Sequence, residues 1–331
     1  MTIGKRSRIY VAGHLGMAGS AIVRRLRAGG YQNLLLRSRA ELDLLDQGAV
    51  RSWMQRERPE YVFLAAAKVG GILANDKFPG DFIRDNLLIQ THVIDAAYHH
   101  GVKKLLFLGS SCIYPKSAPQ PMAEDCLLSG PLEPTNSAYA IAKIAGIEMC
   151  DAYRRQFSFD CLSLMPTNLY GPGDNFDLKA SHVLPALIRK FHEAKQQGAA
   201  EVTVLGTGTP RREFLHADDL ADAAVLLMRL PTQHSLINVG VGLDVTISEL
   251  AELIRDIVGF KGRIRFDPAK PDGTPRKLLD VSRLHSLGWR AKVPLREGVE
   301  ATYRWYLENH QDRPNSCATN TLRLRKKGRI G

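Results

Sequence analysis

A tyrosine and a lysine four residues apart, Tyr139 and Lys143, are the side chains in this sequence whose spacing points most directly to chemistry. Positions i and i+4 share one face of a helix, so the ammonium group would lie beside the phenol. We expect this charge to favour the phenolate and to lower the pKa of the tyrosine, which could then exchange a proton with a substrate. The same spacing also occurs on exposed helices without a catalytic role.

A serine upstream of this pair favours the catalytic interpretation. Ser110 follows the apolar stretch 104–108, which reads as a strand, and open α/β sheets bind ligands at the carboxyl ends of their strands. Its hydroxyl could hold a substrate carbonyl oxygen while Tyr139 supplies the proton. The structural alternative is a cap at the end of the strand.

Three glycines near the N-terminus indicate a dinucleotide site. Gly13, Gly16 and Gly19 lie between a predicted strand and a predicted helix. Such glycines permit a tight turn, a close approach of the pyrophosphate to the backbone and close packing of the helix. The phosphates would then meet the positive end of the helix dipole.

The residues about 20 positions beyond this turn favour NADPH over NADH. NADH-binding versions usually carry a carboxylate there, which binds the ribose hydroxyls and would repel a 2′-phosphate. This chain has Arg37 and Arg39 instead, and guanidinium groups pair well with phosphate. Asp43 and Asp46 follow and could approach the adenine, although Asp46 could equally be a surface charge.

Apolar runs and helical patterns alternate along the first half of the chain. Predicted strands cover residues 8–12, 34–36, 61–65, 104–108 and 160–164, and predicted helices cover 20–28, 85–99 and 137–155. This alternation predicts βαβ units, and hence an α/β fold with a doubly wound parallel sheet of the Rossmann type.

The pattern loosens after residue 172. Residues 237–240 read as a strand that could return to the main sheet, and Thr246 or Ser248 could cap a helix that ends at Val258. Short strands at 202–205 and 263–266 and a last helix at 296–308 complete the prediction.

Composition limits the class of protein. The chain has 331 residues, 44% of them apolar and 24% charged, as soluble globular proteins do. Its apolar runs are too short to cross a bilayer, and five cysteines without paired metal spacing indicate a reducing, cytoplasmic compartment and no metal site. The net charge of +11 comes partly from the basic tail; we expect no nucleic-acid binding, because the tail lacks aromatic residues.

Longer blocks of sequence carry a resemblance to a known family. They are residues 65–72, 108–115, 133–136, 140–146, 165–172 and 270–277. With the glycine turn and the Tyr139/Lys143 pair, they make the chain resemble the extended short-chain dehydrogenase/reductase family that acts on nucleotide sugars. The resemblance runs over nearly all of residues 8–309.

The resemblance implies a two-step reaction on a GDP-linked sugar. GDP-4-dehydro-6-deoxy-D-mannose would be epimerised at C3 and C5, and its C4 ketone would then be reduced with NADPH, giving GDP-L-fucose. Cys112 matches the family's epimerisation base and His182 its acid. Without the resemblance, Cys112 reads as a small buried residue and His182 as a polar residue at the start of a helix.

The resemblance also implies binding residues and an organisation. The cofactor-binding positions are Gly13, Gly16, Met17, Gly19, Arg39, Asp43, Ala66, Lys143, Pro166 and Leu169, and the substrate-binding positions are Asn168, Lys190, Leu205, Arg212 and Lys277. We expect an NADP-binding domain at 1–172 with a return segment at about 236–258, a smaller substrate domain at 173–235 and 259–310, a disordered tail at 311–331, and a homodimer formed through helices that flank the sheet.

Three positions depart from the family pattern, and other functions stay open. Leu15 stands where the family often has a basic residue, Lys190 where it often has arginine, and Leu205 where it can have an aromatic residue. The substrate could instead be a related GDP-keto-deoxysugar, such as a colitose precursor, or the enzyme could reduce without epimerising. A catalytically silent NADP-binding protein is the alternative from a different class.

Overall fold

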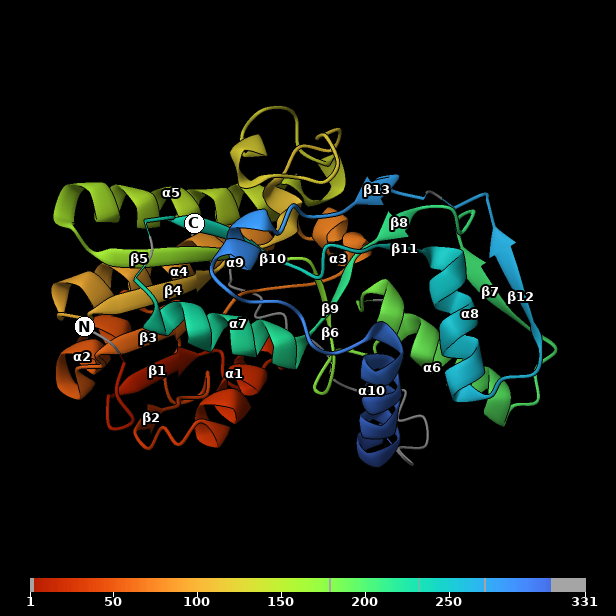
Figure 1. Cartoon of the computed structure of the whole chain (residues 1–331), viewed down its shortest axis with the longest axis horizontal. Coiled ribbons are helices and arrows are strands. Elements are labelled where there is room, and N and C mark those ends of the chain that lie inside the picture. The colour runs from red at the N-terminus through yellow and green to blue at the C-terminus, as the bar shows by residue number, and fades with distance from the viewer. Residues whose placement is uncertain (1–2, 179, 232, 271, 311–331) are drawn as a thin grey trace, which may run out of the picture.

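A parallel sheet forms the centre of the molecule (Figure 1). The computed structural model describes residues 3–310 apart from 179, 232 and 271, and within them six strands pair in the order β10-β5-β4-β3-β1-β2. Their bounds are β1 Ile9–Ala12, β2 Leu34–Leu35, β3 Tyr61–Leu64, β4 Lys104–Leu108, β5 Asp160–Pro166 and β10 Leu236–Val239. The predicted doubly wound parallel sheet is confirmed.

Helices cover both faces of this sheet, because its central strands are apolar on both sides. Every residue of β1, β3 and β4 is buried, as expected for a parallel sheet between two helical layers. One face packs against α2 (Gln47–Glu57), α4 (Pro79–His99) and α5 (Ser137–Phe157). The other packs against α1 (Met17–Ala28) and α7 (Ala217–Arg229).

Two helices begin earlier than their apolar pattern predicts. Helix α1 starts at Met17 rather than at Ser20, because Gly16 is its N-cap and the glycine turn leads straight into it. Helix α4 starts at Pro79 rather than at Asp85. Proline is favoured in the first turn of a helix, since its missing N–H would have no intrahelical partner there.

A second core lies beside the sheet, at the right of Figure 1. It contains α6 (Val183–Gln196), α8 (Ile247–Val258) and α10 (Leu295–His310), with the parallel pair β7 (Glu201–Leu205) and β12 (Arg263–Asp267). Helix α8 starts with the predicted capping box, in which Thr246 and Glu249 satisfy each other's backbone N–H groups.

Helices α7 and α8 pack differently from the expected domain boundaries. Strand β10 does return to the parallel sheet, where it pairs with β5. Helix α8, however, belongs to the second core, whereas α7, expected in the smaller unit, packs against α1 on the sheet. Their apolar faces explain the exchange: Leu220, Ala224 and Leu227 of α7 are buried among the residues that cover the sheet. The division into two units itself stays a prediction.

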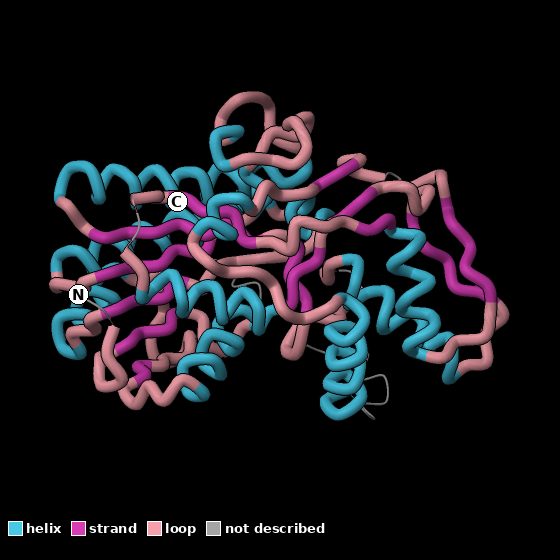
Figure 2. Tube along the Cα trace, in the orientation of Figure 1, coloured by secondary structure: helices cyan, strands magenta, loops and turns pink. Residues whose placement is uncertain are grey.

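Short elements and loops connect the two cores (Figure 2). They comprise β6 (Asn168–Tyr170) paired with β9 (Phe214–His216), the three strands β8 (Arg211–Arg212), β11 (Val245–Thr246) and β13 (Arg276–Lys277), helices α3 (Ile72–Lys77) and α9 (Ser282–Ser286), and 3-10 turns at 111–113, 124–126 and 134–136. The predicted disordered tail at 311–331 lies outside the described residues. Among the helices that are described, none is long and apolar enough to cross a membrane.

Candidate active site

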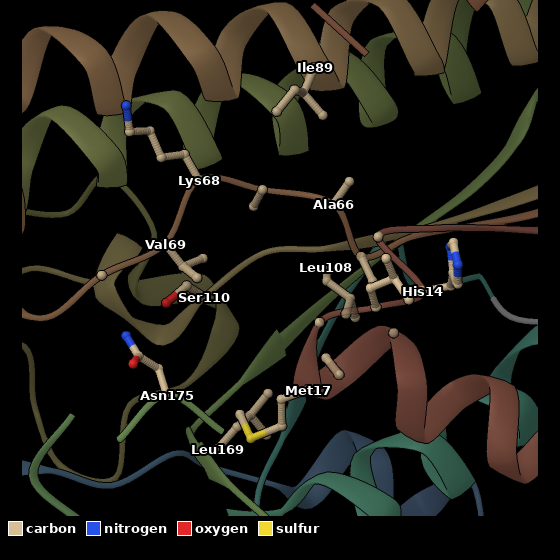
Figure 3. A pocket seen from close by; sticks show the side chains of 18 of the residues that line it. His14, Met17, Ala66, Lys68, Val69, Ile89, Leu108, Ser110, Leu169 and Asn175 are labelled. Carbon is tan, nitrogen blue, oxygen red and sulfur yellow. The ribbon is translucent and has the colours of Figure 1, made fainter. Parts of the chain in front are cut away.

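A cavity of about 680 Å³ opens at the carboxyl ends of the central strands. Its walls come from the loops after β1, β2, β3, β4 and β5, from the start of α5 and from the segment before α6. In the view of Figure 3, Ser110, Val69 and Asn175 lie toward one end of the cavity and His14 toward the other. This is the position at which doubly wound sheets bind their ligands.

The glycine turn fits a dinucleotide. Gly13 has a φ of 81°, and a Cβ atom there would lie 2.7 Å from the backbone of Ala66. A Cβ atom on Gly19 would lie 2.1 Å from the carbonyl oxygen of Gly13. A Cβ atom on Gly16 would meet only that same oxygen, at 3.5 Å. The three glycines thus leave the backbone without side chains where the first turn of α1 meets the cavity, which lets a pyrophosphate approach closely.

The loop after β2 supplies the basic residues of the predicted cofactor site. Arg37, Arg39 and Asp43 all line the cavity. Arg39 is 76% exposed, 3.7 Å from the Asp43 carboxylate, whereas Arg37 donates to the Leu36 carbonyl oxygen at 2.8 Å. Asp46 does not line the cavity. Its carboxylate accepts the Ala49 N–H and caps α2, so of its two predicted roles the structure favours the one outside the cofactor site.

Three predicted catalytic residues meet at one end of the cavity. Ser110 ends the loop after β4, while Tyr139 and Lys143 project from the first turns of α5. The Ser110 hydroxyl lies close enough to the Tyr139 phenol to oppose part of the effect of burial on the pKa of the phenol. The Lys143 ammonium donates to the Leu108 carbonyl oxygen at 2.8 Å and lies 5.9 Å from the centre of the Tyr139 ring.

The expected effect of Lys143 on the tyrosine is wrong for this structure. Burial raises the pKa of Tyr139 above its ordinary value, and the neighbouring Cys112 raises it further. Burial also lowers the pKa of Lys143 to about 8. Desolvation disfavours both the phenolate of Tyr139 and the ammonium of Lys143. In this buried site it exceeds the favourable charge interaction that their spacing alone suggests.

A second group of predicted residues lies next to this one. Cys112 is buried and does not itself line the cavity, and its backbone N–H donates to the Ser110 hydroxyl at 3.4 Å. His182 lines the cavity as the residue before α6, yet its side chain makes no capping bond to that helix. Burial raises the pKa of Cys112 and lowers that of His182, and the Lys277 ammonium is close enough to lower both.

Of the five predicted substrate residues, Asn168 lines the cavity and the other four do not. Arg212 and Lys277 face each other in the β8–β13 pair. Lys190 and Leu205 do not line the cavity: Lys190 donates to the Thr203 carbonyl oxygen of β7 at 3.3 Å, and Leu205 is half-exposed at the end of the same strand. Met17, Ala66, Pro166 and Leu169, expected at the cofactor, all line the cavity.

Other polar residues line the cavity that the sequence did not single out. Lys68 forms ion pairs with Asp81 at 3.1 Å and Asp85 at 3.2 Å. Asp174 has a buried carboxylate oxygen without a partner, and burial raises its pKa to about 7. Lys68 lies in one of the blocks that carried the resemblance, whereas Asp174 had only its place after a glycine-rich turn as a signal. Among the described residues, no cluster of side chains could hold a metal ion.

Comparisons with known proteins agree with this geometry. The model of the NAD dependent epimerase/dehydratase family matches residues 9–240. A protein of Arabidopsis thaliana named putative GDP-L-fucose synthase 2 is 62% identical over 305 residues, which are 92% of this chain and 93% of that protein. The GDP-L-fucose synthase of Escherichia coli (strain K12) is 57% identical over 317 residues, covering 93% of this chain and 98% of that one.

A solved structure shares the fold over nearly the whole length. The crystal structure of a GDP-L-fucose synthetase from Naegleria fowleri bound to NADP superposes with a TM-score of 0.86. It is 29% identical in sequence and covers 94% of this chain and 97% of that chain.

Proposed function

The chain belongs to the NAD dependent epimerase/dehydratase family, and from this membership we propose that it converts GDP-4-dehydro-6-deoxy-D-mannose to GDP-L-fucose with NADPH. The observation that carries the proposal is the position of Ser110. Its hydroxyl lies beside the phenol expected to act in ketone reduction, and it accepts the backbone N–H of Cys112, whose thiol is expected to act in epimerisation, at 3.4 Å. One sugar bound at this serine would therefore reach both sets of groups.

The glycine turn and the loop after β2 would hold the cofactor. The backbone around Gly13, Gly16 and Gly19 would receive the pyrophosphate, and Arg39 would meet the 2′-phosphate. NADPH bound in this way supplies the hydride for the C4 carbon.

In the reduction, the protein would bind and protonate the oxygen of the C4 ketone. Ser110 and Tyr139 would donate hydrogen bonds to this oxygen, and Tyr139 would give it a proton as the alkoxide forms. The raised pKa of Tyr139 keeps that proton on the phenol at neutral pH. Lys143, fixed by the Leu108 carbonyl oxygen, would stabilise the phenolate that the transfer leaves behind.

In the epimerisation, carbons next to the ketone exchange protons. The C4 oxygen, held by Ser110 and Tyr139, would take the negative charge of the enolate, which makes the neighbouring C–H groups acidic. Cys112 would remove the proton as a thiolate, and His182 would return one to the opposite face. Lys277 favours the thiolate, since its positive charge opposes the effect of burial on the pKa of Cys112.

The assembly and the compartment belong to the same proposal. Side chains on α5 such as Ile141 and Phe157 are partly exposed although they are apolar, which supports a homodimer through the helices that flank the sheet. The four cysteines among the described residues are free thiols, which supports a reducing, cytoplasmic environment. Light scattering after size exclusion would measure the oligomeric state.

One assay tests the reaction. Purified protein, NADPH and GDP-4-keto-6-deoxymannose should consume the cofactor, and NMR of the product should show the configuration of L-fucose at C3, C4 and C5. A product with the starting configuration at C3 and C5 would indicate a reductase without epimerase activity. Absence of cofactor consumption would contradict the proposal.

A further inference from the structure

Glu213 is a buried carboxylate at the junction of the elements that carry the predicted substrate cations. It connects β8 to β9, and its side chain is fully shielded from solvent. One carboxylate oxygen accepts the backbone N–H groups of Val241 at 2.6 Å and Gly242 at 2.7 Å, and the other accepts that of Leu279 at 3.0 Å. The side chain thus joins three segments that are distant in sequence.

The backbone of Glu213 extends these connections to the cavity. Its carbonyl oxygen accepts from the Thr167 hydroxyl at 3.2 Å and from the Asn168 amide at 2.8 Å, and both residues line the cavity. Its N–H donates to the Lys277 carbonyl oxygen at 3.3 Å. One residue therefore contacts the wall of the sugar site and the strand that bears a substrate cation.

The two cations beside Glu213 need such support. Arg212 and Lys277 are register partners in the β8–β13 pair. Burial lowers the pKa of each, and the charge of Arg212 lowers that of Lys277 further. Two desolvated like charges repel each other, so their separation depends on the groups that fix the two strands. Glu213 directly follows β8, its N–H donates to the Lys277 carbonyl oxygen of β13, and its carboxylate accepts the Leu279 N–H just beyond β13.

Gly240 leaves the space that this carboxylate fills. A Cβ atom at position 240 would lie 2.3 Å from one oxygen of Glu213 and 2.8 Å from its carboxyl carbon. Real Cβ atoms do not approach other atoms this closely, so a side chain here would displace the carboxylate. The loop after β10 is therefore shaped around Glu213, which gives a second way to disturb the same contact.

We propose that Glu213 is a positioning residue for the GDP-sugar, holding Asn168, Arg212 and Lys277 where the ligand needs them. The inference rests on the proposed function. A buried carboxylate can also stabilise the fold without positioning a ligand, and Asp219 of α7 serves as the comparison. Its carboxylate accepts the backbone N–H groups of Lys292 at 3.0 Å and Val293 at 2.9 Å. None of those three residues lines the cavity.

The test compares Glu213→Gln with Asp219→Asn. The glutamine is isosteric, but its NH₂ group must face a backbone N–H that the carboxylate accepted, which leaves a buried donor unsatisfied. The KM for the GDP-sugar should rise roughly 10-fold or more, while the KM for NADPH stays within about twofold. Asp219→Asn should lower the melting temperature without changing either KM, and Gly240→Ala should reproduce the Glu213→Gln result.

Several results would overturn the proposal. An unchanged KM for the GDP-sugar in folded Glu213→Gln, or an equal rise in both KM values, would reduce Glu213 to a structural residue. If Glu213→Gln does not fold, Gly240→Ala decides by the same criteria. If the native protein does not turn over the GDP-sugar, the proposed reaction fails; calorimetry with GDP then tests Glu213 separately, because the variant should still bind GDP roughly 10-fold more weakly.

Discussion

At neutral pH the proton of Tyr139 stays on the phenol, because burial raises the pKa of this group. In the proposed reaction the residue would therefore act as an acid rather than as a phenolate. Its proton would be transferred only when negative charge develops on the substrate oxygen. This is the protonation state that ketone reduction requires, and it differs from the one that the spacing of Tyr139 and Lys143 suggests.

The first prediction concerns this proton. Tyr139→Phe keeps the ring that packs against Phe82 but removes the acid, so reduction should slow by roughly 100-fold or more. Single-turnover oxidation of NADPH would measure the rate. For the native protein, the rate should fall as pH rises through about 8, because the Lys143 ammonium then loses its proton. Near-native turnover by Tyr139→Phe would remove the phenol from the mechanism.

The second prediction concerns the thiol. Lys277 favours the Cys112 thiolate, so Lys277→Met should raise the thiol pKa and shift the pH profile of deuterium incorporation at C3 and C5 toward alkaline values. Cys112→Ser should block this incorporation at every pH while NADPH still binds. NMR in heavy water would follow both variants. If Cys112→Ser and His182→Asn exchange deuterium at the native rate, both residues are structural.

Among the elements, the loop after β2 is expected to decide between NADPH and NADH. Arg39 is 76% exposed beside Asp43 and lines the cavity, whereas Leu15, which also lines the cavity and is 73% exposed, offers no charge. Arg39→Asp should weaken NADPH binding at least 10-fold and leave NADH binding nearly unchanged. Leu15→Arg should strengthen NADPH binding. Fluorescence titration with both cofactors would measure this, and equal native affinities would contradict the assignment.

The start of α8 gives a prediction about stability. Thr246 accepts the Glu249 N–H at 3.0 Å, so Thr246→Ala should lower the free energy of unfolding by about 1 kcal/mol. Ser248, the other candidate cap in the sequence, accepts no bond in the capping box, and Ser248→Ala is the matched control. Urea denaturation would compare them. If Ser248→Ala lowers the free energy of unfolding as much as Thr246→Ala does, the capping box makes no specific contribution to stability.

The sequence predicts elements well where one local pattern decides them. The buried strands and the capping box of α8 follow from apolar runs and a four-residue motif, and the structure agrees. It predicts less well where a partner distant in sequence decides. The placement of α7 on the sheet and of α8 in the second core depends on which apolar face each helix meets.

The same distinction holds for the site. Residues within motifs, such as Ser110, Tyr139 and Lys143, come together as expected. Their protonation does not follow from spacing, since it depends on burial by side chains from several elements. Glu213 had no local signal, because the backbone N–H groups that its carboxylate accepts come from segments distant in sequence.

At the scale of the whole molecule, two buried lysines differ in the partners of their ammonium groups. Lys104 of β4 donates to the carbonyl oxygens of Leu227 and Leu230, at 3.1 and 2.8 Å, and lies 3.6 Å from the Asp160 carboxylate, so it ties the sheet to α7. Lys143 donates to the Leu108 carbonyl oxygen and lies 4.7 Å from the centre of the Phe107 ring, and no described carboxylate forms an ion pair with it. Burial lowers its pKa to about 8.

This contrast gives the last prediction. A lysine with a folded pKa below its unfolded value binds its proton less tightly in the folded state, so it destabilises the fold at neutral pH. The penalty is full below about pH 8 and fades as pH rises toward the unfolded value near 10.5. Lys143→Met should therefore increase the free energy of unfolding at pH 7 by about 2 kcal/mol, after the lost hydrogen bond is counted, while it abolishes reduction.

Denaturation at pH 7 and near pH 9.5 would measure the effect, with Lys104→Met as the matched control. The advantage of Lys143→Met should shrink at the higher pH, because native Lys143 has by then lost its charge. Lys104→Met should be destabilising at both pH values, since it removes the donor to the carbonyl oxygens of Leu227 and Leu230. A loss of stability in Lys143→Met at pH 7 would mean that the contacts of Lys143 contribute more to stability than the burial of its charge costs, and would contradict this prediction.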